Sequence, residues 1–295
     1  MAFFLNLVVT GVVVGSVYAL VAMGFVLIFK ASRVVNFAQG EFLMVGAYVC
    51  LSFLVWLAFP YPAAVLGTLV FAVLLALLVE RVILRPMIGE PILSVVMVTL
   101  GLASVLRAAV QSVYGTDIRA FPEFFTGEPF RLGGVAVTPA YAGSFVAVLV
   151  LMGLLSLFFK YSKAGVAMRA TAFDQQVALS MGISVKRMFA LAWAIAAMVS
   201  VVGGIFLGNM RGGVDGSLAF IGLKVIPVVI LGGLDSLAGA FVGGLLVGVL
   251  ENLAGGYLDP YVGGGAKEVA PFVLLILILM VRPYGLFGTE EIERV

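Results

Sequence analysis

Long stretches without a single charged side chain dominate this sequence. Residues 62–79, 141–159 and 188–210 contain no Asp, Glu, Lys or Arg. Each stretch comes close to, or exceeds, the roughly 20 apolar residues with which an α-helix crosses about 30 Å of membrane hydrocarbon. The whole chain is 63% hydrophobic and 11% charged, whereas soluble domains are about one half apolar and about one quarter charged. The chain is therefore predicted to be an integral membrane protein, with the lipid bilayer as a partner.

The apolar segments predict a helical bundle rather than a barrel. Only α-helices and closed β-barrels satisfy every backbone hydrogen bond in lipid, and these segments lack the alternating pattern of barrel strands. They cover residues 3–29, 42–59, 62–80, 92–113, 139–159, 187–209, 219–233, 237–254 and 268–282. The segment 219–233 is short and is followed by Gly and Asp, which indicates a broken or re-entrant helix. We expect an all-α, polytopic bundle forming one transmembrane domain over residues 1–295, with about eight full spans and one broken segment.

The distribution of basic residues predicts the orientation. Loops on the cytoplasmic side of a membrane carry an excess of Lys and Arg. The segment 160–187 holds five of them, and if it is cytoplasmic, alternation of the spans puts six more on that side: Lys30, Arg33, Arg81, Arg85, Arg282 and Arg294. These eleven of the 17 basic residues predict an N-terminus outside the cell membrane and a C-terminus on its cytoplasmic side.

The segment 160–187 is predicted to contain one helix over residues 164–181, which are rich in helix formers. This helix is too polar to cross the membrane and too apolar to be only solvated. Gly165 and Gly182 bracket it and are expected to set its angle to the flanking spans. Arg169 and Asp174 would lie about 140° apart around it, so they would not pair and each could meet a partner subunit. The alternative is a connector that lies on the lipid surface.

Polar side chains gather where the first two apolar segments meet. Asn36, Gln39 and Glu41 follow one another within a few residues there. Polar groups at membrane depth are expensive and therefore mark functional candidates. One interpretation is a broken-helix element that lines a polar translocation pathway. The alternative is that Glu41 is a helix-start carboxylate, which the helix dipole favours.

A second polar group flanks the short segment 219–233. Lys224 lies within that apolar run and must pair, snorkel or face a cavity. Asp235 and Glu251 follow it; Asp235 is a candidate for the pathway or a cap of the next helix. Arg107 and Gln111 lie one turn apart within another apolar segment. The two alternatives are that they face the same cavity or snorkel outward, and we expect Arg107 to snorkel outward.

Glycine recurs at a spacing of four residues, in the pairs Gly11 with Gly15, Gly204 with Gly208, Gly239 with Gly243, and Gly244 with Gly248. Small residues at this spacing let helix backbones approach closely in lipid. We expect these glycines to serve tight helix packing rather than to line a pore.

Several kinds of chemistry are excluded by what the sequence lacks. His is absent and Cys50 is the single cysteine, which removes Ser/His/Asp and Cys/His catalysis and any intrachain disulfide. A phosphate-binding loop is missing too, because Lys267 at the end of a Gly-Gly-Gly-Ala-Lys string is followed by neither Ser nor Thr. The net charge is only +2 and no run of five or more Lys and Arg residues is present, which argues against nucleic-acid binding. We expect a chain that is not an enzyme and holds no cofactor, with its energy supplied by another subunit.

Residues 35–48 read Val-Asn-Phe-Ala-Gln-Gly-Glu-Phe-Leu-Met-Val-Gly-Ala-Tyr. This string resembles the signature Asn-Phe-Ala-His-Gly-Glu-x-x-Met-x-Gly-Ala-Tyr of LivH-type permeases, the branched-chain amino-acid subunits of ABC importers. Further resemblance lies at residues 161–165, 231–240 and 283–288, so that the likeness covers essentially the whole chain. Two positions depart from the family pattern: Gln39 replaces the usual His, and Asp235 stands where Gly is common.

The resemblance implies a type II ABC importer permease fold in a bacterial inner membrane. The implied partners are a second, LivM-like permease, two ATP-binding subunits that hold the ATP, and a periplasmic solute-binding protein. In such a complex Gly165, Arg169, Asp174 and Gly182 would belong to the segment that couples the permease to the ATPase. The implied substrates are branched-chain or other hydrophobic amino acids. Related permeases carry urea, short amides or other small polar solutes, and a stand-alone secondary carrier or channel is the competing class.

Overall fold

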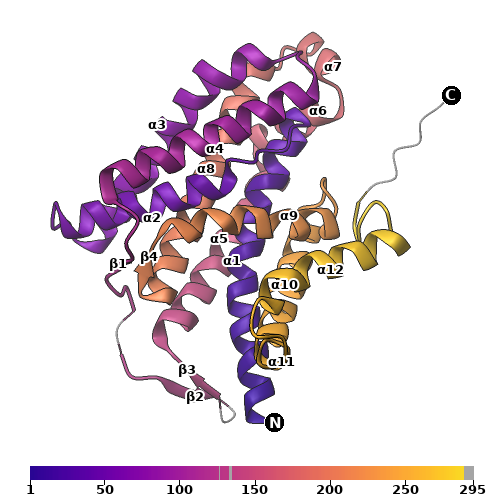
Figure 1. Cartoon of the computed structure of the whole chain (residues 1–295). Helices are drawn as coiled ribbons and strands as arrows, with labels where there is room; N and C mark the ends of the chain where they lie inside the picture. Colours follow the sequence, from indigo (N-terminus) through magenta and orange to yellow (C-terminus); the bar gives the residue numbers. More distant parts are fainter. Residues whose placement is uncertain (126, 133–134, 289–295) are drawn as a thin grey trace.

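The computed structural model describes residues 1–125, 127–132 and 135–288, so Arg294 lies outside the described residues (Figure 1). Its α-helices are α1 (Ala2–Ser32), α2 (Gln39–Val55), α3 (Tyr61–Val79), α4 (Ile92–Tyr114), α5 (Pro139–Tyr161), α6 (Lys163–Phe173), α7 (Gln175–Ser180), α8 (Val185–Arg211), α9 (Ile221–Gly232), α10 (Leu237–Tyr257), α11 (Asp259–Val262) and α12 (Ala266–Val281). Two short antiparallel pairs join β1 (Arg119–Ala120) to β4 (Gly213–Val214) and β2 (Phe130–Leu132) to β3 (Val135–Val137). The prediction of a helical bundle is confirmed.

Six helices in the described part of the chain are long and apolar enough to cross a membrane, namely α1, α3 with its continuation to Met87, α4, α5, α8 and α10. Helix α2 and the segment Gly216–Gly232 are apolar but shorter. The latter consists of a 3-10 turn, Gly216–Phe220, followed by α9 with Pro227 inside it. The segment 219–233 is therefore short, as the sequence indicated, while the figure of eight full spans stays a prediction.

Helices α1 and α8 form the centre of the bundle, and α3, α4 and α5 lie around it. Within the most apolar 18-residue stretch of each helix, 83% of the stretch is buried in α1 and 72% in α8. The corresponding share is 28% or less in α3, α4 and α5. The outer helices expose large apolar side chains such as Leu74, Leu93 and Leu154. A continuous exposed apolar surface of this kind suits contact with lipid.

Four of the eight glycines predicted to serve packing do so between α1 and α10. A Cβ atom at Gly15 would lie 2.5 Å from the carbonyl oxygen of Gly244, and one at Gly248 would lie 2.5 Å from that of Gly11. The two backbones therefore touch along a seam that no larger side chain could enter.

Helix α9 is held at both ends by glycine contacts. A Cβ at Gly222 would lie 2.5 Å from the amide nitrogen of Gly40 at the start of α2, and Gly232 meets Gly239 of α10 in the same way. Backbone packed this closely fixes the position of a short helix that contains a proline.

The ends of the bundle group the loops into two sets (Figure 1). The N-terminus and the β2–β3 pair lie at one end, and α6 and α7 at the other. At the latter end Met168 of α6 packs with Leu27 and Ala31 of α1. The segment after α12 returns there too, where the amide of Leu286 donates a hydrogen bond of 2.8 Å to the carbonyl of Leu231. These groupings agree with the predicted alternation of loops between two sides.

The single helix predicted over residues 164–181 is wrong. The chain breaks at Asp174, whose backbone is extended with a φ of −153°. The Asp174 carboxylate accepts hydrogen bonds from the amides of Gln176, at 2.7 Å, and Val177, at 2.9 Å. Asp is a strong N-cap because its side chain replaces the missing backbone acceptor. Asp174 therefore starts α7, and the angle expected between it and Arg169 on one helix does not apply.

We expect Gly40→Ala to destabilise the protein by about 1–3 kcal/mol, because the new methyl group would collide with the backbone at Ala219 and Gly222. The matched control is Gly101→Ala in α4, since no described atom lies within 4 Å of a Cβ there. This control should be neutral or stabilising by up to about 1 kcal/mol. Thermal unfolding of both variants, followed by circular dichroism in detergent, is the measurement. Equal stability of the two variants would contradict the packing argument.

Candidate functional site

The polar residues before α2 form a connected and buried network. The Asn36 side-chain amide donates to the Gln39 Oε1 at 3.0 Å, and the Asn36 Oδ1 accepts from the amide of Ala38 at 3.0 Å. The Gln39 Nε2 in turn donates to the Ser200 Oγ of α8 at 2.6 Å. The side chains of Asn36 and Gln39 are buried. The sequence identified Asn36 and Gln39 but not Ser200, because Ser200 lies in a run of small and apolar residues without a distinctive pattern.

This network lies deep inside the bundle rather than at its end. After α1 the chain turns back through Arg33, which has a left-handed φ of 56°, and the amide of Phe37 reaches Thr99 of α4 at 3.4 Å. Helix α2 then begins beside Ser200, near the middle of α8. Because Gly40 touches Gly222, α9 begins at the same depth. Two helix N-termini thus meet inside the bundle, the arrangement that discontinuous helices give to solute sites in transporters.

Glu41 in the first turn of α2 forms an ion pair with Arg107 of α4. The Arg107 Nη2 lies 2.5 Å from the Glu41 Oε1, and the guanidinium stands over the Phe220 ring at 4.9 Å from its centroid. The Glu41 side chain is 3% exposed, so it needs a cation to compensate its lost hydration. The expectation that Arg107 snorkels outward is therefore wrong, and Glu41 does more than start a helix.

Lys224 in the first turn of α9 lies between two carboxylates. Its Nζ is 2.7 Å from the Oε1 of Glu251 in α10 and 2.8 Å from the carboxylate of Glu268 in α12. Glu251 is fully buried, and its Oε2 has no hydrogen-bond partner among the described residues. The sequence placed Glu251 near Lys224 but missed Glu268, because nothing in the chain indicated that α12 begins beside α9.

Asp235 lies at the opposite end of α9 from Lys224 and does not share its site. It lines a cavity of about 230 Å³ with Arg33, Tyr284 and neighbouring residues, and it interacts electrostatically with Lys30. The cap of α10 is Ser236, whose hydroxyl accepts from the amide of Gly239 at 3.0 Å. The alternative of Asp235 as the cap is therefore wrong.

The four residues predicted for coupling shape the α6–α7 segment. Gly165 allows α6 to touch the end of α5, since a Cβ there would lie 2.6 Å from the carbonyl oxygens of Phe158 and Phe159. Arg169 donates to the carbonyl of Lys160 at 3.3 Å. Gly182 ends α7 with a left-handed φ of 81°. Asp174 is the N-cap of α7 described above.

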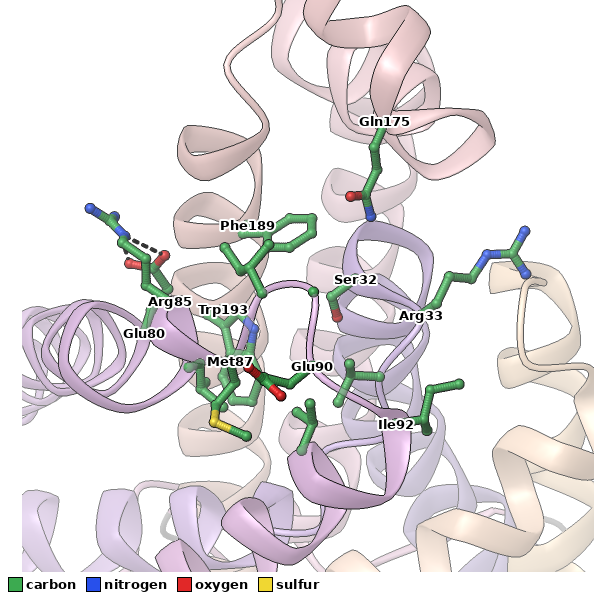
Figure 2. A pocket seen from close by; sticks show the side chains of 15 residues that line it. Ser32, Arg33, Glu80, Arg85, Met87, Glu90, Ile92, Gln175, Phe189 and Trp193 are labelled. Atoms are coloured by element: carbon green, nitrogen blue, oxygen red, sulfur yellow. Dashed lines mark hydrogen bonds and ion pairs between the residues drawn. The ribbon is translucent and has the colours of Figure 1, made fainter.

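A small cavity of about 120 Å³ joins α7 to the loop between α3 and α4 (Figure 2). Gln175 of α7 points into it from one side, and Ser32 at the end of α1 lies opposite. The ion pair of Arg85 with Glu80, at 2.8 Å, closes another side. Gln175 of α7 and the α3–α4 loop thus line one cavity.

A family model described as branched-chain amino acid transport system / permease component matches residues 7–282. The chain belongs to this family. The permease is 32% identical to the high-affinity branched-chain amino acid transport system permease protein LivH of Escherichia coli K12, with 99% of this chain and 98% of that protein covered. It is 31% identical to the corresponding protein BraD of Pseudomonas aeruginosa over the same shares of the two chains.

The permease also resembles a solved structure, that of PsaBC from Streptococcus pneumoniae in complex with Fab. The TM-score is 0.53 at 16% sequence identity, and the match covers 96% of this chain and 93% of that chain. At this identity the likeness concerns the fold alone.

We expect Lys224→Met to destabilise the permease by about 3–5 kcal/mol, because it leaves the buried Glu251 without its cation. Adding Glu251→Gln should recover most of that loss, since the uncompensated charge is then gone. Glu268→Gln is the control and should cost less than about 1 kcal/mol, because the Glu268 side chain is 62% exposed. Chemical unfolding of the three variants in detergent provides the comparison. A stable Lys224→Met variant would show that the pair is not formed.

Proposed function

We propose that this chain is the permease subunit of an ATP-driven ABC importer that moves branched-chain or other hydrophobic amino acids across a bacterial inner membrane. The observation that carries the proposal is the family match over residues 7–282, together with relatives named as branched-chain amino acid permeases that cover 99% of the chain. The six long apolar helices support a multi-pass membrane protein. The proposed fold is that of type II importers, with one transmembrane domain over residues 1–295.

The proposed translocation pathway runs past the point where α2 and α9 begin. Asn36, Gln39, Glu41 and Lys224 supply amides and charges there, and Asp235 lies toward the end that carries α6 and α7. In the described conformation these groups are engaged with other protein groups, such as Ser200, Arg107 and Glu251. A zwitterionic solute would enter when α2 and α9 separate. The ammonium and carboxylate groups of the solute would then replace these contacts between protein groups. Such a pathway opens only transiently, which suits alternating access.

The α6–α7 segment is the proposed contact with the ATP-binding subunits. Its tip exposes large apolar side chains, with Phe173 93% and Met181 77% exposed. Exposed apolar clusters at a loop end mark protein contacts, and a short helix that presents them fits a groove in a partner. The proposed complex contains a second, LivM-like permease, two ATP-binding subunits that hold the ATP, and a periplasmic solute-binding protein. This orientation puts the N-terminus in the periplasm and the C-terminus in the cytoplasm.

Two alternatives use the same geometry. A permease for urea, short amides or another small polar solute would need the same polar residues where α2 and α9 begin, but would not need to select solutes with an apolar side chain. A stand-alone carrier or channel would need no partner. Among the residues that the structure describes, no series of buried carboxylates leads from one end of the bundle to the other. This favours transport driven by separate ATP-binding subunits over a proton-coupled carrier.

We expect proteoliposomes that contain the permease, its partner permease, both ATP-binding subunits and the binding protein to accumulate labelled leucine only with ATP. The permease alone should show neither ATPase activity nor uptake, because it lacks a phosphate-binding loop. Unlabelled valine should compete with leucine, and urea should not. Uptake by the lone chain would contradict the proposal and favour a stand-alone carrier. Competition by urea would show that the permease carries small polar solutes instead of hydrophobic amino acids.

We expect Phe173→Ser to reduce co-purification of the ATP-binding subunits at least about tenfold, the factor that 1.4 kcal/mol implies. Burying an aromatic side chain of this size is worth about 1.5–3 kcal/mol. The matched control is Tyr261→Ser in α11 at the opposite end of the bundle, where the ring is 89% exposed. This control should leave co-purification unchanged. If both variants behave alike, Phe173 is not part of the contact.

A further inference from the structure

A cavity of about 640 Å³ opens between α1, α5, α6 and α10 at the end of the bundle that carries α6 and α7. Its mouth is basic, with Lys30 from α1, Lys160 from α5 and Arg169 from α6. Its floor is apolar, and is formed by Met23, Leu149, Met152, Gly153, Phe159, Leu237 and Phe241. Of these residues, Arg169 alone belongs to the α6–α7 segment that is proposed to contact the ATP-binding subunits.

We propose that this cavity binds an anionic phospholipid, with the phosphate headgroup at the three cations and an acyl chain along the apolar floor. Basic pockets between membrane helices on the cytoplasmic side suit the negative headgroups of that leaflet. None of the described residues that line the cavity is acidic. One carboxylate, Asp235, approaches Lys30 from the α9–α10 connection, so three cations against one anion leave an excess of positive charge.

The length of the cavity fits a lipid better than a free phosphate. Leu149 and Lys160 lie on one helix, and eleven residues of α-helix rise about 16 Å. The site therefore extends from the basic mouth well into the depth of the hydrocarbon. The outer face of α5 exposes Val146, Leu154 and Leu157, so the helix that carries Lys160 also presents an apolar surface that suits contact with lipid.

Binding there would add a polar contact between α6 and the transmembrane helices to the packing of Met168 on α1. Arg169 already donates to the carbonyl of Lys160 at 3.3 Å, and a phosphate between them would add the end of α1 through Lys30. The proposal concerns only this lipid contact and does not depend on which solute the permease carries.

The test measures lipid binding by the full-length chain in neutral detergent, with retained lipid counted by native mass spectrometry. Phosphatidylglycerol is compared with phosphatidylcholine of the same acyl chains. Phosphatidylglycerol should bind at least about tenfold more tightly. Lys160→Gln with Arg169→Gln should weaken it about 30-fold, since each basic residue near a membrane surface is worth about 1 kcal/mol. The control, Lys186→Gln with Arg187→Gln, removes the same charge from exposed positions outside the cavity and should change binding less than twofold.

A second pair of variants tests the apolar floor without removing a charge. Gly153→Leu should fill the cavity and reduce phosphatidylglycerol binding at least about tenfold. Gly101→Leu in α4 is the matched control, because no described atom lies within 4 Å of a Cβ at either position. Both variants should unfold at or somewhat above the wild-type temperature, since the new side chain meets open space and leucine favours a helix more than glycine does.

Three results would overturn the proposal. The first is equal affinity for the two lipids. The second is displacement of the lipid by millimolar inorganic phosphate with no effect of Gly153→Leu, which would make the mouth a site for free phosphate. The third is unchanged lipid binding in the Lys160 and Arg169 double variant together with loss of the ATP-binding subunits, which would make the mouth a protein contact.

Discussion

The close contact of Gly40 with Gly222 holds the interior of this permease together. It brings the starts of α2 and α9 to one point inside the bundle, and each of the two helices carries a charged residue in its first turn. A side chain at either glycine would push the helices apart. The ion pairs of Glu41 and Lys224 with residues of α4, α10 and α12 depend on that placement.

The buried charges of the candidate site are each held next to a charge of opposite sign. Glu41 has Arg107, and Lys224 has Glu251 and Glu268. A charge left unpaired at such depth is expensive, so the proposed pathway would have to exchange one set of partners for another. A solute with its own ammonium and carboxylate offers that exchange, whereas an ion of one sign does not. The geometry is thus suited to a transporter that cycles between closed and open states rather than to a permanent pore.

The segment between α5 and α8 links the interior to the outside of the bundle. Its inner side packs Met168 against α1, and its tip exposes Phe173. Asp174 divides it into two short helices. A push on the tip therefore has a route inward through α6, which packs on the ends of α1 and α5. The proposed lipid would lie on this route.

The sequence by itself determined the class of protein, the positions of most helices and the family. Uncharged apolar runs that lack the alternating pattern of barrel strands satisfy their backbone in lipid as helices, so the predicted segment 92–113 and the observed helix Ile92–Tyr114 nearly coincide. The string around Asn36 was specific enough to indicate the permease family that the comparison shows. Only the tertiary structure decided which polar groups meet. Arg107 pairs with Glu41 across 66 positions of sequence, and Lys224 pairs with Glu268 across 44. Asp174 breaks a segment whose composition favoured one helix. Side-chain partners in a helical bundle depend on how the helices tilt and rotate against one another, and these angles follow from packing between distant segments rather than from any local pattern.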